Sequence, residues 1–314
     1  MSVIGIDLGG TKIASALFND VGDILLDRNV LIENKTGTDV GSLIIHECEE
    51  LMNASKEKND PCDSIGVSVP GIAYANNGNV WAPNIPGWEN YPLKEELLKA
   101  FKDKKLSIQI ESDRSCYILG EKWKGNAQDC KDAIYLSVGT GIGAGILVNG
   151  EILRGSHGIA GAVGWLALSR PYQDDYRNCG DFEYHASGNG IAKLAKEMMK
   201  VQPSVLHSKD KERITSKHII EAADVHDPVA QYIIQSAIEY WGKAIANLVS
   251  IFNPEKIILG GGVFGPGLQY LDAIGQEAKK WAQPISMQQV VLTKSGLDNA
   301  AGLYGAAYLA LQKK

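Results

Sequence analysis

The sequence predicts an α/β protein of two similar domains, each a mixed β-sheet flanked by helices, with a cleft between the domains. Three observations support this fold class. Short apolar strands alternate with amphipathic helices along the chain, a strand–turn–strand pattern at the start recurs in the middle, and 314 residues are enough for two hydrophobic cores.

The composition is that of a globular protein, and it argues against several functional classes. The chain is 45% hydrophobic and 22% charged, and its formal net charge of −6 argues against a general nucleic-acid-binding protein. No apolar run approaches the ~20 residues of a membrane span, and no signal peptide is visible. The five scattered cysteines indicate a cytoplasmic protein with reduced thiols.

The first elements are three consecutive strands joined by tight turns. Apolar segments between turn residues mark the strands: "VIGID" (3–7), "KIASALFN" (12–19) and "DILLDRNV" (23–30). The segment "LGGTK" supplies the first turn, and Asn19-Asp20 begins the second.

The same pattern returns at 133–155, in "AIYLSVGTGIGAGILVNGEILRG". Gly10 precedes Gly22 by 12 residues, and Gly139 precedes Gly150 by 11, so the spacing is nearly the same. The closing pieces "GDILL" and "GEILR" also match. Two strand meanders can resemble each other by chance, but duplication of one α/β unit explains more of the pattern.

The remaining elements alternate between helix and strand. Apolar spacing predicts helices over 42–56, 93–102, 114–125, 227–253 and 300–312, and strands over 64–71, 106–112 and 256–262. We expect a first domain over 1–115 that also includes the last helix, 300–314, and a second domain over 116–299.

Three glycine-rich turns, each after an apolar strand, are candidate ligand-binding sites: "DLGGTK" (7–12), "SVGTGIGAG" (137–145) and "LGGGVFGPG" (259–267). Glycine lets the backbone approach a ligand, and successive N–H groups in such turns can bind phosphate. Neither the Walker A spacing nor the G-x-G-x-x-G spacing of dinucleotide-binding folds is present. A single such turn is more often purely structural, but three together favour phosphate binding.

Asp113 is the candidate catalytic carboxylate. It follows the strand "LSIQIES" and opens a helix, and ligands of open α/β sheets bind at the carboxyl ends of strands. A carboxylate there can orient a hydroxyl for phosphoryl transfer. An ordinary helix N-cap is the alternative interpretation of an aspartate at this position.

Together the three turns resemble the phosphate-1, phosphate-2 and adenosine motifs of the actin-like ATPase superfamily, which has a ribonuclease H-like fold. The resemblance implies that Asp7 holds Mg²⁺ through water and that ATP is the second substrate. It places Lys12 and the backbone of Gly9, Gly10 and Thr11 at the transferred phosphate. It likewise places Thr140 and Gly141 near the β-phosphate, and Gly261 and Gly262 beside the adenosine.

The whole chain, over 2–312, is similar to the ROK family (repressor, open reading frame, kinase). The segments that carry the similarity are "IGIDLGGTKIASAL", "NVWAPNIPGWENYPL", "ESDRSCYILGE" and "PEKIILGGGV". The resemblance implies an ATP-dependent kinase acting on a sugar hydroxyl, with Asp113 as the catalytic carboxylate. No DNA-binding segment precedes "VIGID", which favours the kinase branch over the repressor branch. The family and the apolar helix at 227–253 both favour a homodimer.

The segment 158–188 departs from the family, which usually has G-E-x-G-H, then C-x-C-G-x-x-G-C-x-E with structural zinc. Ala162 stands in place of the first glutamate, Trp165 in place of the histidine, and only Cys179 of the cysteines survives. One cysteine cannot hold a four-coordinate zinc ion, and an unrelated site from Asp181, His157 and His185 is the less favoured alternative. We therefore expect no structural zinc, and we expect packing to hold the loop, through Trp165, Leu166, Leu168, Tyr172 and Phe182.

The same departures alter the predicted sugar site. The family resemblance implies that Asn84, Asp113 and Glu183 contact the sugar, with Ser112 in place of the usual asparagine. Trp165 either stacks on the sugar ring or lies in the core. A site that loses hydroxyl-recognising groups changes its substrate, so we expect a different hexose, a modified sugar or a cyclitol.

Arg114 is unusual beside the candidate carboxylate. We expect it to pair with Glu111 or Glu121, with an anionic substrate as the alternative. A sugar sensor without catalysis is the competing function. The presence of Asp7, Lys12, Thr140 and Asp113 argues against it, since a degenerate sensor could lose all four.

Overall fold

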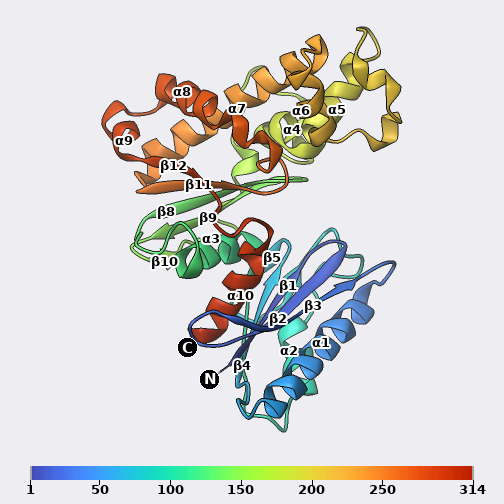
Figure 1. The fold of residues 1–314 in the computed structure, drawn as a ribbon, viewed down its shortest axis with the longest axis vertical. Coiled ribbons are helices and arrows are strands. Elements are labelled where there is room, and N and C mark those ends of the chain that lie inside the picture. The colour runs from blue at the N-terminus through green and yellow to red at the C-terminus, as the bar shows by residue number, and fades with distance from the viewer. Residues whose placement is uncertain (1, 313–314) are drawn as a thin grey trace. The chain divides into compact units, whose positions relative to one another are not determined.

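The computed structural model describes residues 2–312, apart from the side chain of Lys211. The chain divides into two compact units. Unit 1 comprises Met1–Asp129, Ile152–Ala160 and Asn299–Lys314, and unit 2 comprises Cys130–Glu151 and Gly161–Asp298. Each unit is built on a five-stranded mixed sheet (Figure 1).

The sheet of unit 1 has the order β3-β2-β1-β4-β7. Its strands are β1 (Val3–Leu8), β2 (Lys12–Phe18), β3 (Ile24–Leu31), β4 (Ser64–Val69) and β7 (Ser107–Ser112). The first three strands pair antiparallel, while β4 runs parallel to both β1 and β7. The three strands predicted at the start of the chain are confirmed, and so are the strands over 64–71 and 106–112.

Helices cover both faces of this sheet, so β1, β2 and β4 are nearly continuously buried, whereas the edge strand β3 is largely exposed. The helices of unit 1 are α1 (Gly37–Glu57), α2 (Leu93–Ala100), α3 (Asp113–Lys124) and α10 (Ala301–Leu311). A separate small hairpin consists of β5 (Ile72–Ala73) and β6 (Val80–Trp81). Ile4, Ile6 and Leu8 lie on the face of β1 that packs on α1. Val3 and Gly5 alternate with them and lie on the opposite face, against α10. Figure 1 shows α1 and α10 on opposite faces.

The sheet of unit 2 repeats this topology, with the order β10-β9-β8-β11-β12. Its strands are β8 (Ala133–Val138), β9 (Ile142–Val148), β10 (Glu151–Ile152), β11 (Lys256–Gly260) and β12 (Val291–Lys294). As in unit 1, an antiparallel pair, β8 and β9, is followed by parallel neighbours, β11 and β12. The predicted duplication of a mixed sheet is therefore confirmed.

Helices of unit 2 lie on one side of its sheet in Figure 1. They are α4 (Asp181–Ala186), α5 (Gly188–Met198), α6 (Ser216–Asp224), α7 (Pro228–Phe252), α8 (Leu271–Trp281) and α9 (Pro284–Gln289). The helix predicted over 227–253 is confirmed as α7. Its apolar residues pack inside unit 2, with Trp241 fully buried and its indole N–H donating to Ala186 O at 3.0 Å. The apolar character of α7 is thus explained by its own core and gives no separate support for a homodimer.

The division between the units differs from the expected one. Residue 115 lies inside α3, which packs on α10, and the structure assigns the whole chain to Asp129 to unit 1. Close backbone contact explains why α3 stays with α10. A Cβ atom on Gly120 would lie 2.3 Å from Ala301 O, and one on Gly305 would lie 1.8 Å from Cys116 O. The last helix belongs to unit 1.

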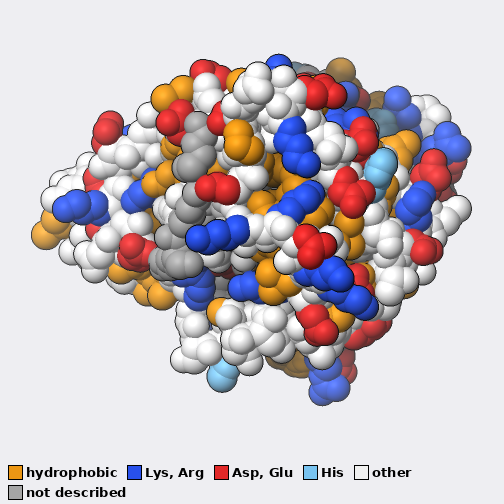
Figure 2. Space-filling model, turned by 90° about the horizontal axis from the view of Figure 1, so that it is seen from below, with side chains coloured by type: hydrophobic (Ala, Val, Ile, Leu, Met, Phe, Trp, Pro, Cys, Tyr) orange, Lys and Arg blue, Asp and Glu red, His pale blue; other side chains and the backbone are white. Residues whose placement is uncertain are grey.

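The helices, the cysteines and the exposed surface give three further observations. No helix among the described residues is long and apolar enough to cross a membrane. All five cysteines are free thiols. On the face shown in Figure 2, basic and acidic side chains are interspersed, so the described residues form no broad basic surface there.

Candidate active site

Asp7 lies near the carboxyl end of β1, where the sheet places it opposite Ser68 on β4. The Ser68 hydroxyl donates a hydrogen bond of 2.7 Å to Asp7 Oδ1. Burial raises the pKa of Asp7 from 3.8 to about 6. The hydrogen bond and Lys12 oppose this shift, and the negative charge of Asp113 adds to it. The two carboxylates singled out in the sequence therefore lie close enough within unit 1 to influence each other.

The first turn of α10 packs against Asp7. A Cβ atom on Gly302 would lie 2.6 Å from Asp7 Oδ2, so a side chain at this position would displace the carboxylate or the helix. The sequence analysis placed a helix here but did not connect it with Asp7. Gly302 is therefore a residue of the site that the sequence analysis missed.

Asp113 is the first residue of α3, and its neighbour Ser112 is the N-cap. The Ser112 side chain accepts a hydrogen bond from Ser115 N and donates one of 3.1 Å to Ser115 Oγ. Two expectations change as a result. The N-cap interpretation of Asp113 is wrong, because Ser112 does that work. The second expectation concerned Ser112 in the sugar site. Ser112 is buried, and its hydroxyl is hydrogen-bonded to Ser115 at the start of the helix.

Burial also raises the pKa of Asp113, and three nearby groups oppose the shift. The first is the charge of Arg114, and the second is the Arg114 backbone N–H, which donates to Asp113 Oδ1 at 2.8 Å. The third is the Tyr117 hydroxyl, which donates to Asp113 Oδ2 at 3.3 Å. Tyr117 follows Asp113 by four residues, a spacing that brings side chains together on a helix, and it was not singled out from the sequence.

Arg114 does not make the ion pair expected of it. Its Nη2 group donates to Gly71 O at 3.3 Å. Glu111 pairs instead with Arg154, whose Nε lies 2.6 Å from Glu111 Oε2. We did not expect Arg154 as the partner of Glu111 because the sequence analysis placed it in the second domain. The structure places its segment, Ile152–Ala160, in unit 1.

The first glycine turn is closed by a hydrogen bond of 2.9 Å from Gly9 N to Lys12 O. A Cβ atom on Gly10 would lie 2.9 Å from Asn84 Nδ2, so the asparagine side chain lies directly beside this turn. Thr11 and Lys12 are exposed at its tip. Unit 1 thus brings the predicted phosphate turn and a predicted sugar contact, Asn84, together.

In unit 2, Glu183 lies beneath the turn between β8 and β9. Its Oε2 accepts a hydrogen bond of 2.6 Å from Ile142 N. Cβ atoms on Gly141 and Gly164 would lie 2.7 Å and 3.0 Å from the same carboxylate oxygen, so glycines surround it. Burial raises the pKa of Glu183, and the hydrogen bond from Ile142 opposes the shift. Glu183 therefore supports the second glycine turn directly.

The third glycine turn lies beside the second. Val263 N donates to Val138 O at 2.9 Å, and a Cβ atom on Gly139 would lie 3.8 Å from Gly262 N. Gly261 has a φ of 90°, and a Cβ atom there would lie 2.6 Å from Val138 O. Gly262 has no atom within 4 Å of a built Cβ. The two adjacent glycines therefore have different roles: Gly261 is needed for the fold, and Gly262 is open.

The predicted residues thus form two groups, one in each unit. Unit 1 brings together Asp7, Gly9, Gly10, Thr11, Lys12, Asn84 and Asp113. Unit 2 brings together Thr140, Gly141, Gly261, Gly262 and Glu183. In both units, a glycine turn follows the carboxyl end of a strand and lies near a carboxylate. This arrangement is suited to binding phosphate and a hydrated cation.

The model of the ROK family matches residues 3–313. The chain belongs to the ROK family. The glucokinase of Halalkalibacterium halodurans is 33% identical over 323 residues, covering 99% of this chain and 95% of its own length. The xylose repressor of Caldicellulosiruptor bescii is 34% identical over 268 residues, covering 82% of this chain and 65% of its own length.

A solved ROK glucokinase from Streptomyces griseus, in complex with glucose and AMPPNP, is 29% identical, with a TM-score of 0.79. The match covers 99% of this chain and 100% of that one. The actin-like ATPase fold predicted from the glycine turns is therefore confirmed. The ROK family includes both sugar kinases and repressors, and this chain is similar to both.

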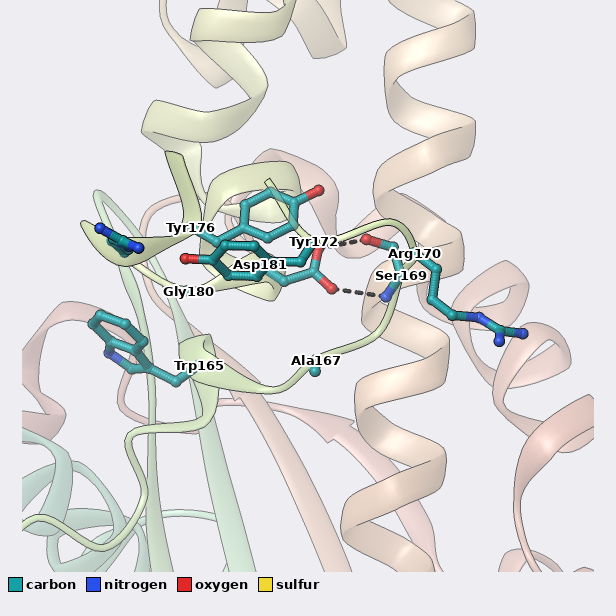
Figure 3. Close-up of a pocket in the computed structure, with 9 residues that line it drawn as sticks. Trp165, Ala167, Ser169, Arg170, Tyr172, Tyr176, Gly180 and Asp181 are labelled. Carbon is teal, nitrogen blue, oxygen red and sulfur yellow. Dashed lines mark hydrogen bonds between the residues drawn. The ribbon is translucent and has the colours of Figure 1, made fainter. Parts of the chain in front are cut away.

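The ROK segment that departs from the family pattern is held by hydrogen bonds to Asp181 as well as by part of the packing that we expected. Asp181 is buried, and its Oδ2 accepts hydrogen bonds from Leu168 N at 2.6 Å and Ser169 N at 2.7 Å. Its Oδ1 accepts one from Ser169 Oγ at 2.8 Å (Figure 3). Of the predicted packing residues Phe182 is fully buried, whereas Trp165 and Tyr172 are 56% and 63% exposed.

No group of three potential ligands among the described residues could hold a metal ion. His185 lies instead in an aromatic cluster: its Nε2 is 2.9 Å from the Tyr176 hydroxyl, and its ring stacks on Tyr240 at a centroid distance of 4.5 Å. Burial lowers the pKa of His185, and Asp181 opposes that shift. The absence of structural zinc from this ROK protein remains a prediction.

Proposed function

We propose that this chain transfers the γ-phosphate of ATP to a hydroxyl group of a sugar or sugar-like polyol. The observation that supports this most is the pair Asp7 and Asp113, two interacting carboxylates beside the exposed Lys12 in unit 1. Phosphoryl transfer needs charge neutralisation and an oriented nucleophile more than covalent chemistry. In this proposal a cation at Asp7 and the side chain of Lys12 neutralise phosphate charge, and Asp113 orients the nucleophile.

In this proposal Asp113 orients the acceptor hydroxyl. Its carboxylate accepts a hydrogen bond from the hydroxyl and takes the proton as the oxygen attacks the γ-phosphorus and ADP leaves. Burial raises the pKa of Asp113, which makes it a better proton acceptor than an exposed aspartate. The Tyr117 hydroxyl at 3.3 Å and the Arg114 N–H at 2.8 Å hold the carboxylate in place.

The residues around Asp7 fit a hydrated Mg²⁺ ion. Burial and the charge of Asp113 raise the pKa of Asp7, so a divalent cation would stabilise its ionised form. Magnesium commonly binds through one or two carboxylates, waters and substrate phosphates, so a set of three protein ligands is not required. When bound, the ion would neutralise charge on the phosphates.

The glycine turns supply the nucleotide contacts. In unit 1 the backbone of Gly9, Gly10 and Thr11, together with Lys12, contacts the transferred phosphate. In unit 2 Thr140 and Gly141 contact the β-phosphate. Gly262 passes beside the adenosine, with Gly261 shaping the turn. The AMPPNP complex of the Streptomyces griseus relative supports ATP as the phosphate donor.

The sugar contacts proposed are Asn84, Asp113 and Glu183. Asn84 is exposed beside the first glycine turn. Glu183 uses Oε2 for the Ile142 N–H, and Oε1 is the atom proposed to accept a sugar hydroxyl. Ser112 contributes by capping α3 and thereby placing Asp113.

The experiment is a panel of hexoses, amino sugars and cyclitols incubated with Mg-ATP, with ADP release measured. We expect turnover on at least one member. The substitution Asp113→Asn should lower kcat by about 10²–10⁴-fold. Asp20→Asn, an exposed aspartate in a turn of unit 1, is the matched control and should leave kcat unchanged. Near-wild-type turnover by Asp113→Asn would show that the assignment of Asp113 is wrong.

A sugar sensor without phosphoryl transfer is the second candidate function, favoured by the similarity to a xylose repressor. It predicts sugar binding by calorimetry with no ADP release on any sugar. The homodimer and the cytoplasmic location expected from the sequence are also proposals. Analytical ultracentrifugation and cell fractionation test them.

A further inference from the structure

A cavity of about 580 Å³ lies within unit 1, beside the edge strand β7. Three segments form most of its wall: the turn of the β5–β6 hairpin, the start of α2 and the loop 154–158. Its described lining residues include none that we assigned to ATP or to the sugar. The volume lies within the ~300–1,000 Å³ range of small-molecule sites. The cavity is therefore large enough for a ligand of its own.

Close contacts at two glycines fix the wall of this cavity. Gly78 has a φ of 72°, and a Cβ atom there would lie 2.5 Å from Lys94 Cβ, so the hairpin turn packs tightly on the start of α2. Gly158 has a φ of 71°, and a Cβ atom there would lie 3.3 Å from Ala73 O, so the loop 154–158 packs on the hairpin. The three segments therefore hold one another in place around the cavity.

The charged side chains of this cavity leave an excess of positive charge. Lys94 and Arg154 line it together with Glu111, which is the one carboxylate among its described lining residues. Arg154 Nε lies 2.6 Å from Glu111 Oε2, so the charges of this pair offset each other. Lys94 forms no ion pair with any residue that the structure describes. Its charge is therefore left for an anionic ligand.

Three basic side chains that line the cavity have hydrogen-bond donors without partners. Arg154 uses Nε for Glu111, and its two Nη groups bond to no residue of the described chain. The ammonium group of Lys94 and the ring of His157 also make no hydrogen bond within residues 2–312. A guanidinium group, an ammonium group and an imidazole N–H together suit the several acceptor oxygens of a phosphate group.

The cavity is linked to the start of α3 through Glu111. One carboxylate oxygen of Glu111 pairs with Arg154, and the other, Oε1, accepts a hydrogen bond of 3.0 Å from Ser112 N. Ser112 is the N-cap of α3, which begins with Asp113. A phosphate group bound to Arg154 would compete with Glu111 for the guanidinium group. Occupancy of the cavity should therefore alter the part of the chain that places Asp113.

We propose that this cavity is an effector site for a small phosphate monoester, which binds to the three basic side chains and lowers kcat through Glu111. The phosphate group takes the donors that have no partner. The carbon body lies on the apolar part of the wall, to which Ala73, Ile110 and Leu309 contribute. Binding of the monoester is independent of the proposed kinase function, whereas its effect on kcat rests on that function.

Calorimetry on the full-length protein, without nucleotide or sugar, compares glycerol 3-phosphate with glycerol and glycerate. We expect saturable binding of glycerol 3-phosphate, weaker binding of glycerate and none of glycerol. Lys94→Gln keeps most of the side chain that packs on Gly78 but removes its charge, and it should raise the Kd for glycerol 3-phosphate about tenfold. His157→Ala should raise it about threefold. Lys99→Gln, at an exposed lysine of α2 outside the cavity, is the matched control and should leave the Kd unchanged.

Initial rates at saturating Mg-ATP and sugar measure the effect on catalysis. Glycerol 3-phosphate should lower kcat about threefold, because it disturbs the placement of Asp113 without occupying the ATP or sugar contacts. A competitor at those contacts would leave kcat unchanged at saturating substrates, so this measurement separates the two modes of inhibition. At the same concentration of glycerol 3-phosphate, Lys94→Gln should lose most of the inhibition, and Lys99→Gln should keep it.

Several outcomes would overturn the proposal. No binding of glycerol 3-phosphate up to about 10 mM, or equal binding by Lys94→Gln and the wild type, would exclude the site. Loss of binding in Lys12→Ala would place the phosphate at the first glycine turn instead. Equal affinity for glycerate would contradict the phosphate class, and an unchanged kcat at saturation with glycerol 3-phosphate would contradict the effector role. If no sugar is phosphorylated at all, the calorimetry still decides the binding site, because it uses neither ATP nor turnover.

Discussion

At the residue scale, the site rests on carboxylates whose protonation the protein alters. Burial raises the pKa values of both Asp7 and Asp113, and the charge of Asp113 raises that of Asp7 further. While the proposed cation is not bound, two buried carboxylates make the site less stable than a neutral one would be, a common cost of function. Two predictions follow from the groups around these carboxylates.

Asp7→Asn should stabilise the protein while abolishing turnover. The folded-state pKa of Asp7 is about 6 and its ordinary value is 3.8, so the folded protein binds the proton more tightly than the unfolded chain. Stability from this group is therefore fully present below about pH 4 and is lost as the pH rises through about 6. We expect the free energy of unfolding of Asp7→Asn to exceed that of the wild type by about 1–3 kcal/mol at pH 8, and by less at pH 4.5.

Urea denaturation without Mg²⁺ at the two pH values measures this difference. The same raised pKa predicts that the wild type needs more Mg²⁺ for half-maximal activity as the pH falls below about 6. An Asp7→Asn variant that is less stable than the wild type at pH 8 would contradict the prediction.

Tyr117→Phe should shift the pH profile of the reaction. The Tyr117 hydroxyl stabilises the ionised form of Asp113, so its removal raises the pKa of Asp113 further. Because Asp113, the proposed base, must be ionised to accept a proton, the acidic limb of the kcat/KM profile should move to higher pH. At pH 8.5 we expect a loss of less than about threefold. An unshifted limb with a uniform loss across pH would mean that Tyr117 acts only through packing.

At the element scale, the glycine turns differ in why they contain glycine. Gly261 is required by its φ of 90° and by its contact with Val138 O, whereas Gly262 has free space around it. The residues of the loop before α4 also differ in how far the fold uses them. Its backbone is fixed by Asp181, while its aromatic side chains, Trp165 and Tyr172, are left exposed.

Gly262→Ala and Gly261→Ala should separate nucleotide binding from folding. We expect Gly262→Ala to change the free energy of unfolding by less than about 0.5 kcal/mol, yet to raise KM for ATP about tenfold by placing a methyl group at the nucleotide. Gly261→Ala should cost about 2–4 kcal/mol of stability. Thermal denaturation and ATP titrations measure both effects. Unchanged ATP kinetics in Gly262→Ala would contradict the adenosine assignment.

Asp181→Ala should destabilise unit 2 by about 2–4 kcal/mol, because it leaves two backbone N–H groups and the Ser169 hydroxyl without their acceptor. Urea denaturation of the variant and of the wild type measures this loss.

The loop should need no structural zinc. Chelators should leave the melting temperature of the wild type unchanged, and elemental analysis should find no zinc. A full equivalent of zinc per chain would contradict the prediction. Denaturation with and without a chelator tests the first part, and elemental analysis tests the second.

At the scale of the whole molecule, the end of the chain completes the unit in which the chain begins. α10 packs on β1 and β4 so closely that Cβ atoms on Gly5 and Gly66 would lie 2.8 Å and 1.8 Å from its backbone carbonyl oxygens. The same helix meets α3 through Gly305 and meets Asp7 through Gly302. Folding of unit 1 and formation of its carboxylate site therefore both depend on the last helix.

Gly305→Ala should lower the free energy of unfolding by about 3 kcal/mol or more, because its Cβ would overlap Cys116 O and the two helices must move apart. Gly275→Ala in α8 is the matched control, since its Cβ would make an ordinary contact of 3.5 Å with Leu292. That variant should be neutral or stabilising by about 0.5–1 kcal/mol. Equal stability of the two variants would contradict the packing argument.

Much of the fold could be predicted from the sequence, because local patterns specify it. Alternating strands and helices, the repeated meander and the glycine turns indicated the two sheets, and the structure confirms β1, β2 and β3 as well as α7. The short elements α4, α5, α6, α8, α9 and β12 were not predicted, since their apolar patterns are brief and depend on packing. The boundary at 115 was wrong because contacts of α3 with α10 join segments far apart in the chain.

The sequence by itself determined the family, the glycine turns proposed to bind phosphate and the two candidate carboxylates, because these are encoded in contiguous residues. Only the tertiary structure decided how the supporting groups are used. Ser112 caps a helix, Glu183 accepts the N–H of Ile142, and Asp181 holds the loop. Each depends on burial or on a partner whose identity no local pattern specifies, and a hydrogen-bonding side chain can serve many partners until the fold selects one.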